Sequence, residues 1–348
     1  MLRRLFKDFR WGVLPVPGRV IAIVFFVALF IFPLFTDKAY YLFLFTTANI
    51  FVIFAVSWDL LSGYSGQVNF GHALFFGVAA YSAALLNKYF GLQPWATIPI
   101  ATLVATGIGV VTSIPALRLR GPYLSLLTMA FPIMLMGIVM SFKDVTGGEW
   151  GITGLPRLAD TRIGQYYICL IVMTVAVLIM WKLSDARGKY IRTGLIFHAI
   201  REDEIAARAS GINTIRYKIL AFAIGGFFAG LAGSLYAHIL GTVGLATLSV
   251  TLSFQAIIYV VFGGIASIYG AVIGVYTLRL LLEVVGGATV IGKYQMLILA
   301  GIVILILLFM PEGVGVWVRG KIERECPRCK LTNAAWRREC RACSANLR

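Results

Sequence analysis

Residues 40–61 read YYLFLFTTANIFVIFAVSWDLL, an apolar run in which Asp59 is the only charged residue. A helix needs about 20 apolar residues to cross the roughly 30 Å hydrocarbon core of a bilayer. The run is long enough for this, and it predicts a transmembrane helix. The rest of the chain continues the pattern, since 59% of its 348 residues are hydrophobic and only 13% are charged.

Nine further apolar stretches bring the predicted number of spans to ten. They are Val20–Phe35, Val68–Leu86, Ala96–Leu117, Pro122–Phe142, Gly164–Leu183, Tyr217–Leu240, Thr251–Ile268, Gly270–Val285 and Tyr294–Met310. The stretches 68–86 and 270–285 are glycine-rich or short, so we expect them to be re-entrant or broken. The composition excludes a soluble globular protein and a disordered chain. We predict an all-α polytopic membrane protein of about ten transmembrane helices, including short or broken ones.

The net charge of +16 is explained by orientation in a membrane. Lys and Arg are retained on the cytoplasmic side of membrane proteins. With the N-terminus inside and the spans alternating, 24 of the 31 Lys and Arg lie inside and six outside. We therefore expect a multi-pass protein of a prokaryotic plasma membrane with both termini cytoplasmic, and no nucleic-acid partner is needed to explain the charge. The predicted parts are an interfacial N-terminus (1–18), a transmembrane domain (19–312) and a basic cytoplasmic tail (313–348).

A polar segment interrupts the apolar pattern after the second span. Residues 63–72 read GYSGQVNFGH, and we call Gly63–His72 the polar segment. Irregular backbone at membrane depth is tolerated only against protein or a water-filled cavity. The segment is therefore either a broken helix that lines a pathway or a plain cytoplasmic turn. On the first interpretation the candidate residues are Gly63, Tyr64, Gly66, Gln67, Gly71 and His72.

The longest internal loop contains residues 201–211, REDEIAARASG. The pattern predicts one short helix with Glu202 and Glu204 in its first turn, where acidic residues complement the helix dipole. Ala207 lies in its middle, and Gly211 is suited to cap it in the left-handed conformation. A compact helix of small side chains fits a groove on a partner, although a solvated loop helix has the same pattern.

Arg279 and Glu283 lie four residues apart within the ninth predicted span. Residues at this spacing are neighbours on a helix, so we expect an intramembrane ion pair. Ionisable residues inside membranes are functional candidates by default. A structural pair and a gate or substrate contact are equally compatible with the sequence.

The tail carries the pattern Cys326-x2-Cys329-x10-Cys340-x2-Cys343. Two CxxC pairs supply four thiolates, which suits tetrahedral Zn²⁺. Four protein ligands leave no open position, so we predict a structural zinc ion in a small C-terminal zinc ribbon, which adds to the all-α membrane fold. An iron–sulfur site and a redox dithiol pair are the rival interpretations.

Motifs for catalysis are missing from the sequence. It contains no G-x4-G-K-[ST] phosphate loop, no H-E-x-x-H and no G-x-S-x-G. We predict that the chain is not an enzyme and binds no nucleotide itself, so if ATP drives this protein, another chain must hydrolyse it.

Several of these stretches together resemble the permeases of branched-chain amino acid ABC transporters. The resemblance extends from about residue 20 to 315, and it rests on Trp58–Gly77, Leu117–Tyr123, Thr146–Gly148, Ala199–Asn213 and Phe262–Gly270. Two features depart from the family: Asp59 stands where an amide is frequent, and the cysteine-rich tail is not usual.

The resemblance implies a heteromeric importer. Cytoplasmic ABC ATPase subunits drive it, a sister permease completes the pathway, and an extracytoplasmic binding protein delivers the substrate. We call residues 201–211 the coupling segment, because Glu204–Gly211 within it resembles the coupling helix that docks on the ATPase. The polar segment would flank the pathway, and the loop around Thr146–Gly154 would face the binding protein. The subunit would lie among membrane lipid and carry leucine, isoleucine or valine. Urea, short amides or other amino acids are the alternative cargoes within the family, and an ATP-independent channel or secondary transporter is the alternative from another class.

Overall fold

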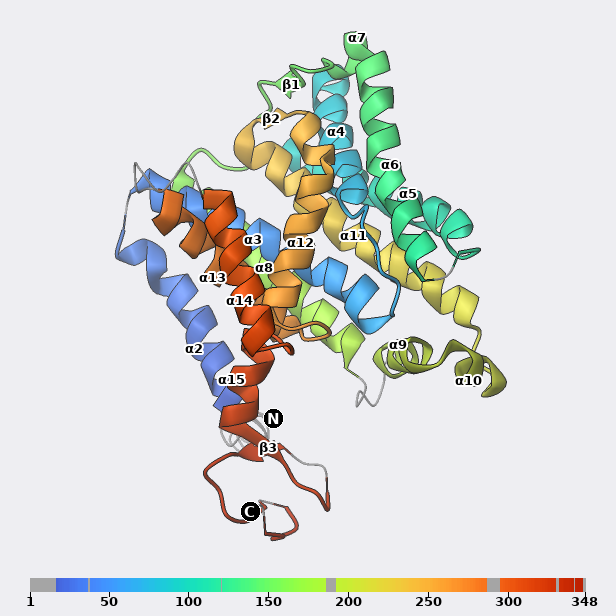
Figure 1. Ribbon diagram of the computed structural model, residues 1–348. Coiled ribbons are helices and arrows are strands. Elements are labelled where there is room, and N and C mark those ends of the chain that lie inside the picture. Colours follow the sequence, from blue (N-terminus) through green and yellow to red (C-terminus); the bar gives the residue numbers. More distant parts are fainter. Residues whose placement is uncertain are drawn as a thin grey trace, which may run out of the picture.

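The computed structural model describes residues 17–36, 38–119, 121–185, 192–286, 295–329, 332–340 and 342–346. They form an all-α polytopic bundle with two small two-stranded sheets (Figure 1). The predicted interfacial N-terminus lies outside the described residues except for residues 17 and 18.

Helices account for most of the described chain. They are α2 (Pro17–Ile31), η1 (Phe32–Leu34), α3 (Ala39–Trp58), η2 (Asp59–Tyr64), α4 (Ala73–Phe90), α5 (Pro94–Ala116), α6 (Pro122–Ser141), α7 (Lys143–Thr146), α8 (Arg162–Ser184), α9 (Thr193–Glu202), α10 (Glu204–Ala209), α11 (Thr214–Leu240), η3 (Leu245–Leu248), α12 (Val250–Gly263), α13 (Ile268–Gly286), α14 (Gln295–Phe309) and α15 (Val314–Ile322). Strands β1 (Ile152–Thr153) and β2 (Thr242–Val243) pair antiparallel, as do β3 (Glu323–Glu325) and β4 (Thr332–Ala334).

The predicted count of about ten transmembrane helices, including short or broken ones, is not confirmed. Within the described residues, six helices are long and apolar enough to cross a membrane: α3 with η2, α4, α5, α6, α8 and α11. Helices α12 and α13 add a seventh if they are counted as one span, because they meet at a bend of 112°. Helices α2 and α14 have 15 residues each, fewer than the roughly 20 that a straight crossing requires.

Helix α3 forms the centre of the bundle. Its residues from Thr46 to Trp58 are all buried, and α8, α11, α12 and α13 pack around it. Helix α11 packs closely on α4, where a Cβ added at Gly233 would lie 2.0 Å from the Phe76 carbonyl oxygen. Glycine allows this close approach of two helices, which is how membrane bundles gain van der Waals contact.

The bend between α12 and α13 is made by residues Gly264–Ser267, which we call the break. Ala266 has a φ of +56°, an uncommon backbone conformation for a residue with a side chain. Helix α15 packs against the break, since a Cβ at Gly315 would lie 2.6 Å from the Gly263 carbonyl oxygen. The C-terminal tail is therefore joined to the transmembrane bundle at this point.

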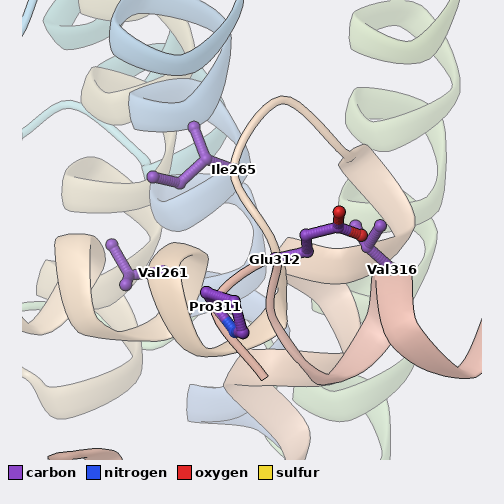
Figure 2. Close-up of a pocket in the computed structure, with 5 residues that line it drawn as sticks. All are labelled: Val261, Ile265, Pro311, Glu312 and Val316. Atoms are coloured by element: carbon purple, nitrogen blue, oxygen red, sulfur yellow. The ribbon is translucent and has the colours of Figure 1, made fainter. Parts of the chain in front are cut away.

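A small cavity of about 240 Å³ lies beside the break (Figure 2). Val261 and Ile265 line it from the side of α12, and Pro311, Glu312 and Val316 line it from the turn between α14 and α15. Ligand sites combine apolar walls with several convergent polar groups. Glu312 is the one charged residue among the five that line this cavity, which lacks such a set.

The two ends of the bundle carry different elements (Figure 1). Helices α9 and α10 lie at the same end as the tail with β3, whereas α7 and the β1–β2 sheet lie at the opposite end. The coupling segment and the cysteine-rich tail are thus on one side, and the loop around Thr146–Gly154 is on the other.

Candidate functional site

The polar segment begins in the π-helical turn η2 and leads into α4. Except for Gly66 and Val68 at the surface, its residues are buried or half-buried. π-Helical turns are rare and are frequent at functional sites. The segment is thus packed against protein rather than solvated as a simple turn.

Hydrogen bonds fix the shape of the polar segment. His72 is fully buried, and its Nε2 lies 2.8 Å from Ser57 Oγ. The Trp58 indole N–H donates to the Asn69 carbonyl oxygen at 2.6 Å, and the Asn69 carboxamide oxygen accepts from the Gly71 N–H at 2.8 Å. His72 therefore acts as a packed helix-end residue with a hydrogen-bond partner.

Two glycines of the polar segment are required by close packing. A Cβ at Gly63 would lie 2.0 Å from the Asp59 carboxylate, and a Cβ at Gly71 would lie 1.8 Å from the Thr128 carbonyl oxygen. Gly66 has a φ of +74°, in the region that glycine adopts without strain.

The coupling segment forms two helices instead of the one predicted. Helix α9 ends at Glu202, and α10 begins at Glu204. Asp203 separates them because its carboxylate accepts from the backbone N–H groups of Ile205 and Ala206, at 2.8 and 3.0 Å. This N-cap satisfies backbone donors that α10 leaves unpaired. Glu202 therefore belongs to the end of α9 and not to a first helical turn.

Ion pairs hold α10 against α11. The Glu204 carboxylate lies 2.7 Å from Lys218 Nζ and 2.5 Å from an Arg208 guanidinium nitrogen. Partial burial raises the pKa of Glu204, but hydrogen bonds and charge from Lys218 and Arg208 outweigh it and hold this pKa below its usual value. Glu204 is therefore ionised at neutral pH. Lys218 was not among the predicted residues, because it lies 14 residues away on α11 and no local spacing links it to Glu204.

The remaining coupling residues shape the other side of α10. Ala207 is buried, and Gly211 has a φ of +83°, the left-handed conformation expected of a helix cap. Ile205 is 72% exposed on the outer surface.

Helices α9 and α11 contact the polar segment directly. The rings of Tyr64 and His198 meet edge to face with 5.3 Å between their centroids. Gly66 lies against Arg201, whose Cα would be 3.2 Å from an added Cβ. The Gln67 amide donates to the Lys218 carbonyl oxygen at 3.4 Å. Nothing in the sequence pattern indicated these contacts, because they join residues more than 130 positions apart.

Arg279 and Glu283 do not form the predicted ion pair. Among the described residues, no carboxylate lies within salt-bridge distance of Arg279. Its guanidinium donates instead to Thr47 Oγ1 at 2.7 Å and lies over the Phe51 ring, 4.6 Å from the centroid. The physical reason is that both partners lie on α3, the helix packed against α13, whereas spacing along α13 alone does not decide where a long side chain points.

The four tail cysteines come together as predicted. Their sulfur atoms all lie within 4.8 Å of one another, with 3.5 Å between Cys326 and Cys343 and 3.4 Å between Cys329 and Cys340. Four thiolates at about 2.3 Å from one Zn²⁺ stand roughly 3.8 Å apart, so the cluster fits such an ion with small adjustments. Backbone N–H groups of Ala342 and Cys343 lower the pKa of Cys340 to about 6, which favours the thiolate that metals bind.

The loop at the opposite end is anchored by the β1–β2 sheet. Thr146 donates to the Val139 carbonyl oxygen at 2.7 Å, and Gly147 and Gly148 both adopt positive φ. Trp150 is 92% exposed at the tip.

Comparison with known proteins identifies the family. The model of the family described as "Branched-chain amino acid transport system / permease component" matches residues 40–308, more than three quarters of the chain. The chain belongs to this permease family. The permease is 28% identical to the high-affinity branched-chain amino acid transport system permease protein LivM of Escherichia coli, over 83% of this chain and 72% of that protein.

More distant relatives agree with this assignment. The permease is 26% identical to the high-affinity permease protein BraD of Pseudomonas aeruginosa, over 77% of this chain and 92% of that protein. It is 25% identical to the probable permease protein LivH of Methanocaldococcus jannaschii, over 77% of this chain and 89% of that protein. No solved structure matches the chain. The protein is thus a multi-pass membrane transport component, and the predicted fold class and family are confirmed.

Proposed function

We propose that the chain is the permease subunit of an ATP-driven importer for branched-chain amino acids, and that the coupling segment docks on a separate ATPase subunit. The relatives named above are transport permeases for branched-chain amino acids, which supports this cargo. The observation that carries the mechanism is the direct contact of Tyr64 and Gly66 in the polar segment with His198 and Arg201. A displacement of α9 by a partner is transmitted directly to the polar segment, and α10 reaches that segment through α9.

The surface of α10 supports a docking role. Ile205 projects from it, and the neighbouring alanines leave room for a close approach of the partner. Glu204 ties α10 to α11 through Lys218. A force applied to α10 is therefore passed to a helix of 27 residues that crosses the bundle.

The other partners follow from the family. A sister permease would complete the pathway, and an extracytoplasmic binding protein would contact the loop around Thr146–Gly154, at the end opposite the coupling segment (Figure 1). On this proposal the coupling segment and both termini are cytoplasmic. The chain itself binds no nucleotide and lies in the inner membrane among lipid.

Reversal of one charge tests the coupling. In proteoliposomes that contain the whole importer, we expect Glu204→Lys to abolish most of the ATP-driven uptake of leucine while ATP hydrolysis continues. Gly211→Pro should act in the same way because it removes the cap. Glu312→Lys is the matched control, since Glu312 is an exposed carboxylate outside the coupling segment. Normal uptake and normal ATPase binding in both coupling variants would refute the proposal.

The same vesicles distinguish the alternatives. A channel or secondary transporter would accumulate or equilibrate leucine with no ATPase present, whereas the importer requires it. Competition by urea, acetamide and other amino acids decides the cargo within the family.

We also propose that Cys326, Cys329, Cys340 and Cys343 bind one structural Zn²⁺. The support is the close approach of the four sulfur atoms and the lowered pKa of Cys340. Metal analysis of the purified chain should give about one zinc per chain. The double variant Cys326→Ser, Cys329→Ser should lose it, and Cys169→Ala, a cysteine in α8 outside the cluster, should keep it. Retention of zinc in the double variant, or iron in place of zinc, would contradict the assignment.

A further inference from the structure

Helices α3 and α13 run antiparallel and share a polar seam. Arg279 donates to Thr47 at one end, and Asp59 accepts from the Ala266 N–H at the other. Between them the Tyr276 hydroxyl donates to the Asn49 carboxamide oxygen. Hydrogen bonds between polar side chains join helices inside a membrane bundle. Burying these polar groups in the membrane also costs free energy.

Buried polar atoms without a hydrogen-bond partner gather at this seam. Five such side-chain atoms occur in the described part of the chain, and four of them are Asn49 Nδ2, Asp59 Oδ2, Tyr259 Oη and Arg279 Nε. The fifth, the Tyr81 hydroxyl, lies on α4. Native proteins leave few buried polar groups unpaired, and each calls for an explanation.

Three of the four atoms are hydrogen-bond donors that come from three different helices. Asn49 on α3 is fully buried, Tyr259 on α12 is 2% exposed, and Arg279 is on α13. Phe51 links the cation and the phenol, because its ring centroid is 4.6 Å from the guanidinium carbon and 6.2 Å from the Tyr259 ring centroid. Asn49 accepts a hydrogen bond from Tyr276 on α13. Tyr276 lies one helical turn before Arg279, on the same face of α13.

The cluster has a positive charge and no anion. No carboxylate of the described chain pairs with Arg279, and Asp59 is ten residues from Asn49 along α3, about 15 Å away. A carboxylate only accepts hydrogen bonds, at two oxygens with about four lone pairs. The Arg279 guanidinium and the Tyr259 hydroxyl also interact with each other. Together with the Asn49 amide, they match a carboxylate in charge and in hydrogen-bonding capacity.

We propose that Arg279, Asn49 and Tyr259 form a binding site for the carboxylate of the amino acid that the permease carries. This inference rests on the proposed transport function and names the part of the substrate that the chain recognises. The Arg279 Nε–H and the Asn49 amide donate to the carboxylate, and the Tyr259 hydroxyl donates from α12. Helices α12 and α13 meet at the break. A carboxylate bound at the site therefore connects both of these helices to α3.

The buried hydroxyls of Tyr259 and Tyr81 provide a test, because only the Tyr259 hydroxyl lies beside Arg279. Removing an unpaired buried hydroxyl leaves a protein equally or more stable when nothing binds there. Tyr259→Phe and Tyr81→Phe should therefore both keep the thermal stability of the free permease. In the complex with its ATPase, purified without the binding protein, only Tyr259→Phe should weaken stabilisation by leucine, by about three- to tenfold in apparent Kd.

Analogues identify the recognised group. 4-Methylpentanoate, which keeps the carboxylate, should raise the melting temperature of the wild-type complex as leucine does, and leucinamide, which lacks the carboxylate, should not. Arg279→Gln should raise the apparent Kd for leucine and for 4-methylpentanoate by about tenfold or more. If chloride alone raises the melting temperature and leucine adds nothing, the site holds an inorganic anion and the assignment is overturned.

Two further outcomes separate this inference from the proposed function. If the wild-type importer takes up leucine with ATP but Tyr259→Phe and Tyr81→Phe respond to leucine alike, the carboxylate site is refuted and the importer stands. If the wild-type complex shows no ATP-driven uptake of any amino acid, the proposed function itself fails.

Discussion

The Asp59 carboxylate accepts a hydrogen bond of 2.7 Å from the backbone N–H of Ala266, 207 residues further along the chain. This contact joins the end of α3 to the break between α12 and α13. Ala266 has the positive φ that the bend requires, and Asp59 is fully buried. The break is thus fixed by a side chain from the centre of the bundle.

Loss of the Asp59 carboxylate should loosen the break. Asp59→Ala leaves the buried Ala266 N–H without its acceptor, which costs about 1–3 kcal/mol, so we expect the free energy of unfolding to fall by that amount. Asp59→Asn keeps an accepting oxygen and should lose less. Thermal unfolding of the purified chain measures both, and equal stability of Asp59→Ala and the wild type would show that the contact is not needed.

Gly63→Ala should destabilise the same contact. The added Cβ would meet the Asp59 carboxylate at 2.0 Å, so the carboxylate must leave Ala266. Gly107→Ala is the matched control, because a Cβ there meets nothing within 4 Å in the interior of α5. The control should be neutral or more stable by about 0.5–1 kcal/mol, since alanine favours helix over glycine. The same change in melting temperature for both variants would contradict this prediction.

The ion pairs of Glu204 should make the stability of α10 depend on pH. The pKa of Glu204 is lower in the folded chain than in the unfolded one. Its contribution is therefore complete above the unfolded pKa and is lost as the pH falls through the folded value. We expect Glu204→Gln to melt below the wild type at pH 7, and the difference to shrink as the pH falls below about 4.3. A difference that stays constant with pH would show that ionisation of Glu204 is not involved.

Glu323 should hold the tail to the bundle. Its carboxylate accepts from the Gly18 N–H at 2.8 Å and pairs with Arg319 at 2.7 Å, and only 4% of its side chain is exposed. Without the Glu323 carboxylate, the Gly18 N–H and Arg319 lose their shared acceptor, and the tail is held less firmly. Glu323→Ala should therefore speed trypsin cleavage within residues 319–330. Glu312→Ala is the control, since Glu312 is an exposed carboxylate on the preceding turn. Unchanged cleavage in Glu323→Ala would show that the tail is held by other contacts.

Most helices were predictable because the length of an apolar run is a local property. The run Pro122–Phe142 became α6, Pro122–Ser141, and Gly164–Leu183 became α8, Arg162–Ser184. The cysteine cluster was also predictable, because each CxxC pair already brings two sulfur atoms together. Asn49 was not among the predicted site residues, although a carboxamide in the middle of the apolar run 40–61 is a signal that could have found it.

The sequence by itself determined a membrane-embedded helical protein with a four-cysteine tail, because hydrophobic length, glycine-rich breaks and ligand spacing are properties of short stretches. Only the tertiary structure decided which polar groups meet. It paired Asp59 with Ala266, Arg279 with Thr47 and Glu204 with Lys218, and it brought Tyr64 to His198. The physical reason is that a buried polar group must find a partner in space, and that partner is chosen by how whole helices pack, which no local pattern records.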